Sequence, residues 1–133
     1  MSDVTKKLKK FARSTQTAIA VEASDDMLIP LSAAFGTVFA FSVTVPLVKK
    51  KNIVYREQIS DIGLMPESGL IYVEPAGLRH LPEFRSIFQH HKPTLMIWSG
   101  EHLDKKITRW IVDQAHYELV DLAKRHQLWK FKQ

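Results

Sequence analysis

The chain has 133 residues, a formal net charge of +5 and no cysteine. This length suits one globular domain with a sizeable hydrophobic core. The absence of cysteine excludes disulfides, thiolate metal sites and a cysteine nucleophile, and it is compatible with the cytoplasm, the location we predict. The positive charge favours a polyanionic partner, either nucleic acid or an anionic membrane surface.

The first segment has the pattern of a basic amphipathic helix. Ser2 and Asp3 can cap it, and apolar residues recur at helical spacing from Val4 to Ala18. We predict a helix over residues 2–23. Its opposite face would carry five basic residues, which are Lys6, Lys7, Lys9, Lys10 and Arg13.

The segment from Met27 to Val48 contains no charged residue, and two interpretations of it stay open. About 20 apolar residues are enough to cross a bilayer, so the segment could be a single-pass membrane helix over residues 27–48. The C-terminal part would then be a small α/β domain on the cytoplasmic side. Alternatively, the alternation from Phe39 to Val45 predicts a strand with one better-buried face. Gly36 then precedes that strand as ordinary punctuation.

The rest of the chain predicts alternating strands and helices. Short apolar runs predict strands at Asn52–Arg56, Leu70–Val73 and Thr94–Trp98, and a helix is expected over Pro82–His90. A final helix is predicted after Gly100, because apolar residues recur at helical spacing from Leu103 to Leu122.

In the soluble interpretation the order of elements is α-β-β-β-α-β-α. Strands that run together and are then interleaved with helices predict a single α/β domain, a mixed sheet flanked by helices. The expected core covers about residues 36–126, and a basic and aromatic tail covers residues 124–133.

This order also occurs in restriction-endonuclease-like folds, which suggests a divergent metal-dependent nuclease as one alternative. Such enzymes hold a divalent ion with carboxylates and use a lysine two residues after a strand-end acid. Glu57, Asp61 and Glu74 could cluster at the end of the sheet. The lysine position after Glu74 is Ala76, which weakens the hypothesis.

Two further patterns have simpler structural explanations. Ser99 can cap the final helix, and Glu101 in the first turn would favour the helix dipole, so a ligand site at Ser99–His102 is not required. His90 and His91 are adjacent and diverge on a helix, so a metal site with His102 or His116 is not expected. We therefore predict no catalytic residue, no metal and no cofactor.

Basic clusters are the strongest functional signal. We predict a non-catalytic basic protein that binds nucleic acid or another polyanion through its phosphates. Trp129 could stack on an unpaired base or pack on the core. A membrane-anchored accessory subunit with a protein partner is a second alternative. Besides the first-segment residues, the predicted site contains Lys49, Lys50, Lys51, Lys124, Arg125, Trp129, Lys130 and Lys132.

Overall fold

The structure is a computed structural model that describes residues 8–9, 17–42, 48–56, 69–98, 104–123 and 126–132. Its strands are β1 (Thr17–Val21), β2 (Thr37–Phe41), β3 (Ile53–Arg56), β4 (Leu70–Val73), β5 (Thr94–Trp98), β6 (Tyr117–Ala123) and β7 (His126–Phe131). Its helices are α2 (Asp25–Ala34), the 3-10 helix η2 (Pro75–Phe84), α3 (Arg85–His90), α4 (Lys105–Arg109) and the π-helix η3 (Trp110–Gln114).

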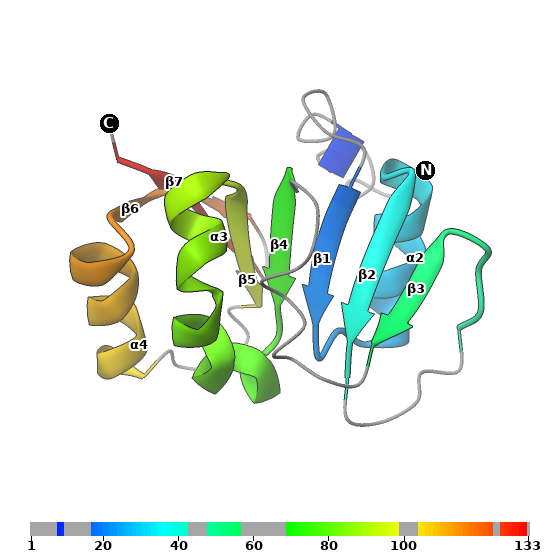
Figure 1. Cartoon of the computed structure of the whole chain (residues 1–133), viewed down its shortest axis with the longest axis horizontal. Helices are drawn as coiled ribbons and strands as arrows, with labels where there is room; N and C mark the ends of the chain where they lie inside the picture. Colours follow the sequence, from blue (N-terminus) through cyan, green and yellow to red (C-terminus); the bar gives the residue numbers. More distant parts are fainter. Residues whose placement is uncertain are drawn as a thin grey trace.

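All seven strands form one mixed sheet in the order β3-β2-β1-β4-β5-β7-β6 (Figure 1). The first five strands of this order are parallel, while β7 pairs antiparallel with both β5 and β6. Every residue of β4 is buried, as expected for a central parallel strand covered on both faces. The predicted mixed sheet flanked by helices is confirmed.

Helices cover both faces of the sheet (Figure 1). Two apolar layers are buried between the helices and the sheet. On one face α2 packs Met27, Leu28 and Leu31 against the sheet. On the other face η2, α3 and η3 supply a larger layer, which includes Phe84 and Phe88. Consecutive residues of β1 and β4 contribute to opposite layers, which explains their unbroken apolar sequences.

The uncharged segment Met27–Val48 divides into two elements. Its first part belongs to α2, and β2 follows at Thr37–Phe41. A chain reversal at Phe35 and Gly36 separates them, and residues 43–47 lie outside the described residues. Within the described part of the chain, no helix is long and apolar enough to cross a membrane. The membrane-span hypothesis therefore gains no support, and the cytoplasmic location stays a prediction.

The predicted helix at residues 2–23 is wrong at its C-terminal end. Leu8 and Lys9 are helical, but Thr17–Val21 form β1. A short apolar run such as Ala18-Ile19-Ala20-Val21 fits both a helical stripe and a buried strand, so periodicity alone cannot decide. Pairing with β2 and β4 on either side decides it here.

The predicted long final helix is also wrong. Helical structure ends at Gln114, and His116 adopts a positive φ of 59° that turns the chain into β6. The predicted tail over residues 124–133 contains β7, which lies between β5 and β6. By contrast, the strands predicted at Asn52–Arg56, Leu70–Val73 and Thr94–Trp98 are confirmed as β3, β4 and β5.

Candidate functional site

The strand order defines one topological switch point. β1 and β4 are parallel neighbours, but the chain leaves β1 into α2 on one face and leaves β4 into η2 on the other. In open α/β sheets, ligands bind outside the carboxyl ends of the strands at such a point. These ends lie along the lower edge of the sheet in Figure 1. The residues Glu22, Ser24, Asp25, Tyr72 and Glu74 surround this point and are called the switch-point site below.

Three carboxylates belong to the switch-point site. Glu22 follows β1 directly, and its Oε2 accepts a hydrogen bond from the hydroxyl of Ser42 at 3.4 Å. Asp25 opens α2, and its Oδ1 accepts from the backbone N–H of Val48 at 3.3 Å. Glu74 follows β4. Two acids directly after adjacent strands and a third at the start of α2 place negative charge at this edge, which suits a ligand with a positive group.

Glu74 is held by hydrogen bonds across the switch point. Its Oε2 accepts from the backbone N–H of Ser24 at 2.6 Å and from the phenol of Tyr72 at 2.9 Å. Ser24 is the N-cap residue of α2, so the carboxylate also lies near the positive end of that helix. The main chain of Glu74 donates to the carbonyl of Val21 at 3.2 Å, which ties both strands together beyond their last paired residues.

Tyr72 is a neutral hydrogen-bond donor in this arrangement. Its side chain is fully buried, and this burial, together with the neighbouring Glu74 carboxylate, raises the pKa of Tyr72 above its ordinary value. The phenol therefore keeps its proton at neutral pH. Its role is to donate to Glu74 rather than to exchange a proton.

Two aromatic side chains extend the site towards β5 and β7. His126 opens β7 opposite Trp98, the last residue of β5, and their rings lie 5.2 Å apart between centroids. The His126 ring also lies 5.8 Å from the Tyr72 ring and is only 5% exposed. An aromatic wall therefore adjoins the acidic residues.

The first turn of η2 packs directly on the end of β1. The N–H of Gly77 donates to the carbonyl of Glu74 at 2.8 Å. A Cβ atom added to Gly77 would lie 2.7 Å from Val21 Cγ1 and 3.1 Å from the Val21 carbonyl oxygen, both closer than van der Waals contact. A side chain at position 77 would require Val21 to shift, so η2 packs tightly against the end of β1.

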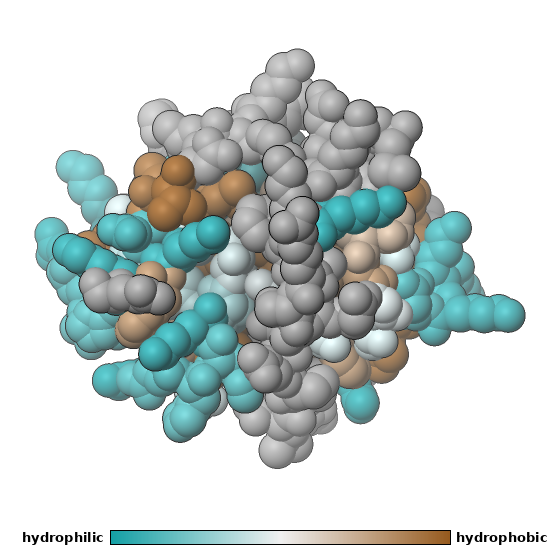
Figure 2. Space-filling view, turned by 90° about the horizontal axis from the view of Figure 1, so that it is seen from above, coloured by the Kyte–Doolittle hydropathy of each residue, from teal (hydrophilic) through white to brown (hydrophobic). Residues whose placement is uncertain are grey.

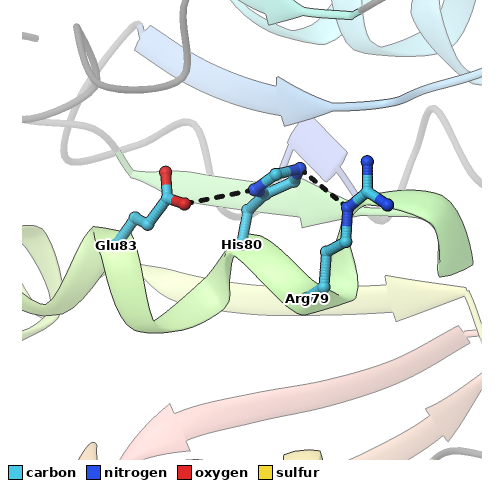
Figure 3. A network of polar contacts seen from close by, with 3 residues as sticks. All are labelled: Arg79, His80 and Glu83. Atoms are coloured by element: carbon cyan, nitrogen blue, oxygen red, sulfur yellow. Dashed lines mark hydrogen bonds and ion pairs between the residues drawn. The ribbon is translucent and has the colours of Figure 1, made fainter.

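A polar network covers the outer surface of η2 (Figure 3). The Nε–H of Arg79 donates to Nε2 of His80 at 3.1 Å, and Nδ1 of His80 lies 3.3 Å from Oε1 of Glu83. A neutral imidazole with its proton on Nδ1 satisfies both contacts. The network ties successive turns of η2 to one another at the surface.

The turn between β1 and α2 lacks the glycines of a dinucleotide-binding loop. It reads Glu22-Ala23-Ser24-Asp25, whereas that loop needs glycine for the tight turn and for close approach of a pyrophosphate. Glu22 itself adopts a positive φ of 54°. The turn therefore offers carboxylates where a phosphate-binding loop offers backbone N–H groups.

A cavity of about 600 Å³ lies elsewhere, at the η3 and β6 end of the molecule. Its lining includes the exposed side chains of Val112 and Leu119 together with His116. We place the candidate site at the switch point instead, because the fold binds ligands at the carboxyl ends of its parallel strands.

The predicted basic residues do not converge within the described chain. Lys49, Lys50 and Lys51 are exposed before β3, at one edge of the sheet. Lys130 and Lys132 are exposed on and after β7, five strand spacings or about 24 Å away. Figure 2, which views the molecule from above Figure 1, likewise shows hydrophilic surface at both ends of the long axis. Lys9 is exposed, while Lys6, Lys7, Lys10, Arg13, Lys124 and Arg125 lie outside the described residues.

Trp129 packs on the core, the second of its two predicted placements. It is 5% exposed and belongs to the apolar layer beneath η2 and α3. Phe131 is half-buried against Tyr117, with the ammonium of Lys92 4.7 Å from its ring centroid. The Trp129 ring therefore has no open face for a base.

The nuclease hypothesis involves residues that are only partly described. Glu74 ends β4 as predicted, but Glu57, Asp61 and the segment Ser99–His102 lie outside the described residues. Among the residues that are described, no three His, Asp or Glu side chains lie together as metal ligands would.

Sequence reasoning missed most of the switch-point site. It selected Glu74 but not Glu22, Ser24 or Tyr72. An available signal was the apolar run of β1 followed by an acid and then Ser24-Asp25, which is a strand end leading into a helix cap. Because residues 2–23 were assigned to one helix, the end of β1 was not recognised.

Comparison with known proteins places the fold. No protein-family model and no curated protein sequence matches the chain. Among solved structures, a ribosomal protein L11 methylase from Lactobacillus delbrueckii subsp. bulgaricus superposes with a TM-score of 0.61 at 10% identity, over 96% of this chain and 75% of that one. A Burkholderia thailandensis 1,6-didemethyltoxoflavin-N1-methyltransferase with bound S-adenosylhomocysteine gives 0.53 at 9% identity, over 96% and 76%.

A protein complex is also among the neighbours. The chain matches a fibrillarin/Nop5p complex with a TM-score of 0.56 at 10% identity, over 90% of this chain and 74% of that one. A protein, nucleic-acid or membrane partner for this chain stays a prediction.

These comparisons correct the predicted function. The structural neighbours are mostly methyltransferases, which contradicts the prediction of a non-catalytic basic protein that binds nucleic acid. At these identities the likeness concerns the fold alone. The chain has a Rossmann-like α/β fold, which these methyltransferases share.

Proposed function

We propose that this chain is a methyltransferase-type domain that binds an S-adenosyl ligand at the switch-point site. The observation that carries the proposal is the position of Glu22 and Glu74, two carboxylates on the adjacent ends of β1 and β4. Ligands of open α/β sheets bind at this position, and in dinucleotide-binding members of such folds a carboxylate hydrogen-bonds a ribose hydroxyl. The bound S-adenosylhomocysteine of one structural neighbour supports the class of ligand.

The chemistry of the residues suits most of such a ligand. Its ammonium group, and the sulfonium of the methyl donor, are positive and complement the carboxylates of Glu22, Asp25 and Glu74. Glu22 together with Ser42 offers acceptors for ribose hydroxyls. The Trp98 side chain, which is partly exposed beside the buried His126 ring, supplies an aromatic wall. When bound, the donor supplies the methyl group, while these residues bind and orient it.

The carboxylate of such a ligand would meet a backbone N–H that already donates a hydrogen bond. This carboxylate would seek backbone N–H groups at the start of α2, as anions do at helix N-termini. The Ser24 N–H there already donates to Glu74. The positive and ribose parts of the ligand therefore fit the free chain better than its carboxylate does.

Titration of the purified chain with S-adenosylhomocysteine, followed by calorimetry or ligand-observed NMR, tests the proposal. We expect saturable binding, and Glu22→Gln should weaken it about tenfold or more because a charged hydrogen-bond acceptor is replaced by a neutral one.

Glu118→Gln is the matched control, because it removes the same charge from the exposed face of β6, three strands away from β4. It should leave the affinity unchanged. A folded parent protein whose dissociation constant is weaker than about 1 mM would contradict the proposed function.

A further inference from the structure

The outer edge of β6 is the less protected of the two edges of the sheet. Within the described residues β6 is the last strand in the order, so no strand pairs with it on its outer side. At the opposite edge, the lysines of residues 49–51 are exposed just before β3, and Arg56 is exposed on it. Charged residues of this kind block edge-to-edge association. By contrast, β6 contains neither Lys nor Arg.

Exposed apolar side chains gather at the β6 edge. Val112 on η3 is 45% exposed, and Leu119 and Val120 on β6 are 44% and 47% exposed. These are three of the five large hydrophobic side chains that are exposed in the described part of the chain. Figure 2 shows hydrophobic surface among hydrophilic side chains at the left end of the molecule, where Figure 1 places α4 and β6. Clustered apolar surface indicates an interaction site, whereas a single exposed apolar residue does not.

Hydrogen bonds hold the cavity between η3 and β6 in a defined shape. The N–H of Lys132 donates to the His116 carbonyl at 2.7 Å, which joins the end of β7 to the turn before β6. The Tyr117 hydroxyl donates to the Pro93 carbonyl at 2.6 Å and so anchors the start of β6. Trp129, which is 5% exposed, also lines this cavity of about 600 Å³. Because the surface is already ordered, a partner that binds there pays little conformational entropy.

Charges of both signs surround the apolar residues. The lining of the cavity includes Asp113 and Glu118 together with Lys132. A second cavity of about 240 Å³ adjoins it, since Asp113 lines both, and Lys106 and Arg109 line this second cavity. In a two-fold contact each residue of one copy meets a different residue of the other copy. A surface that carries both signs can therefore complement itself, whereas the basic edge at β3 would repel its own copy.

We propose that two copies of this chain associate through the η3–β6 face, which consists of Val112, Asp113, Glu118, Leu119 and Val120. The two-fold axis passes beside Val120, so the two β6 strands run antiparallel and the apolar side chains of both copies pack together. Acids and cations of the two copies alternate around this apolar centre. The occupant is a second copy rather than a strand of another protein, because the charges of the face complement one another. The inference is independent of the proposed ligand.

Sedimentation equilibrium of the purified chain tests the proposal. We expect the parent to have twice the mass of one chain at about 100 µM, a concentration that detects even weak dimers. Val112→Lys and Val120→Lys should each weaken the dimer at least about tenfold, because each places two like charges at the contact. Ile29→Lys is the matched control, since Ile29 is 50% exposed on α2, which lies beside β2 and β3 (Figure 1). It should leave the dimer intact, and circular dichroism verifies that each variant is folded.

A cross-linking experiment tests the same contact with a milder substitution. The chain has no cysteine, so Val120→Cys introduces a single thiol. Two such thiols beside the two-fold axis can form a disulfide, which needs Cα atoms about 4.4–6.8 Å apart. Under mild oxidation Val120→Cys should form covalent dimers at least about tenfold faster than Ile29→Cys, which measures random collision.

Three results would overturn the proposal. A folded parent that stays monomeric at about 1 mM would leave the η3–β6 face to a segment of another protein or to solvent. A dimer that persists in both lysine variants, or that Ile29→Lys also dissociates, would place the contact elsewhere. Equal rates of disulfide formation at positions 120 and 29 would show that β6 does not lie beside its copy.

Discussion

At the scale of single residues, Gly77 packs directly against Val21 at the end of β1. A methyl group at position 77 would overlap Val21 Cγ1 and the Val21 carbonyl. We therefore expect Gly77→Ala to lower the free energy of unfolding by about 1–3 kcal/mol, the usual range for overpacking. Urea denaturation measures this change.

A second glycine provides the control for that prediction. Gly36 is exposed, and no described glycine has a positive φ, so Gly36→Ala should cost much less. Adding Val21→Ala to Gly77→Ala removes Cγ1 and should make the pair less destabilising than the sum of the single changes. Equal stability of Gly77→Ala and the parent would contradict the close packing.

Residue types alone predicted little of the candidate site. Glu74 could be recognised as an acid at a strand end, because the apolar run of β4 stops directly before it. Its partners could not, since Ser24 is 50 residues away and only the pairing of β1 with β4 brings the two together. Trp129 shows the same limit, because an aromatic residue among lysines is as typical of a binding surface as of a buried strand. The position of β7 in the sheet decides that Trp129 is buried in the core.

At the scale of elements, α2 contains a residue that weakens it. Pro30 lies in the middle of the helix, where it cannot donate a backbone hydrogen bond. We expect Pro30→Ala to raise the free energy of unfolding by about 1–3 kcal/mol, because the carbonyl one turn earlier regains its donor. Thermal or urea denaturation can measure the gain.

Pro75 is the matched control within the same fold. It opens η2, where the missing N–H has no helical partner to lose. Pro75→Ala should therefore change stability by less than about 0.5 kcal/mol. If both substitutions had the same effect, the position of Pro30 within α2 would not explain the change.

The elements also show where periodicity misleads. Leu119 and Leu122 continue the helical spacing of Ile107 and Ile111, yet the first pair belongs to β6 and the second pair to α4 and η3. The left-handed conformation of His116 separates them, and a histidine at that position carries no sequence signal for a turn. Strands β3, β4 and β5 were predictable because their apolar runs are short and bounded by polar residues, Gly or Pro.

At the scale of the whole molecule, two buried tyrosines link stability to alkaline pH. Burial raises the pKa of Tyr117, whose hydroxyl donates to the Pro93 carbonyl at 2.6 Å. Burial and then the Glu74 carboxylate raise the pKa of Tyr72. In the unfolded chain both phenols ionise near their ordinary pKa of about 10.

The sign of the effect follows from proton binding. Above about pH 10 the unfolded state loses phenol protons that the folded state keeps, so the free energy of unfolding falls as the pH rises. Below that pH both states keep their phenol protons, so the stabilisation by the buried phenols is fully present. Each tyrosine should add a slope of up to about 1.4 kcal/mol per pH unit, which urea denaturation between pH 9 and 11 can measure.

Phenylalanine variants assign this slope to individual tyrosines. Tyr117→Phe and Tyr72→Phe should each make the fall shallower, whereas Tyr55→Phe should change it least because Tyr55 is 37% exposed. An unchanged alkaline slope in the double variant of Tyr72 and Tyr117 would show that other groups cause it.

The sequence by itself determined only part of the fold. In the soluble interpretation, its apolar runs and their order predicted a mixed sheet flanked by helices, because local periodicity reports which faces are buried. The core extends beyond the predicted residues 36–126, since Leu8, β1, α2 and Leu128 also contribute to it. Only the tertiary structure decided the strand order, the division of Met27–Val48 into α2 and β2, and the meeting of Ser24, Tyr72 and Glu74. The physical reason is that parallel pairing joins segments far apart in the chain, and no local pattern records which distant strand completes a sheet.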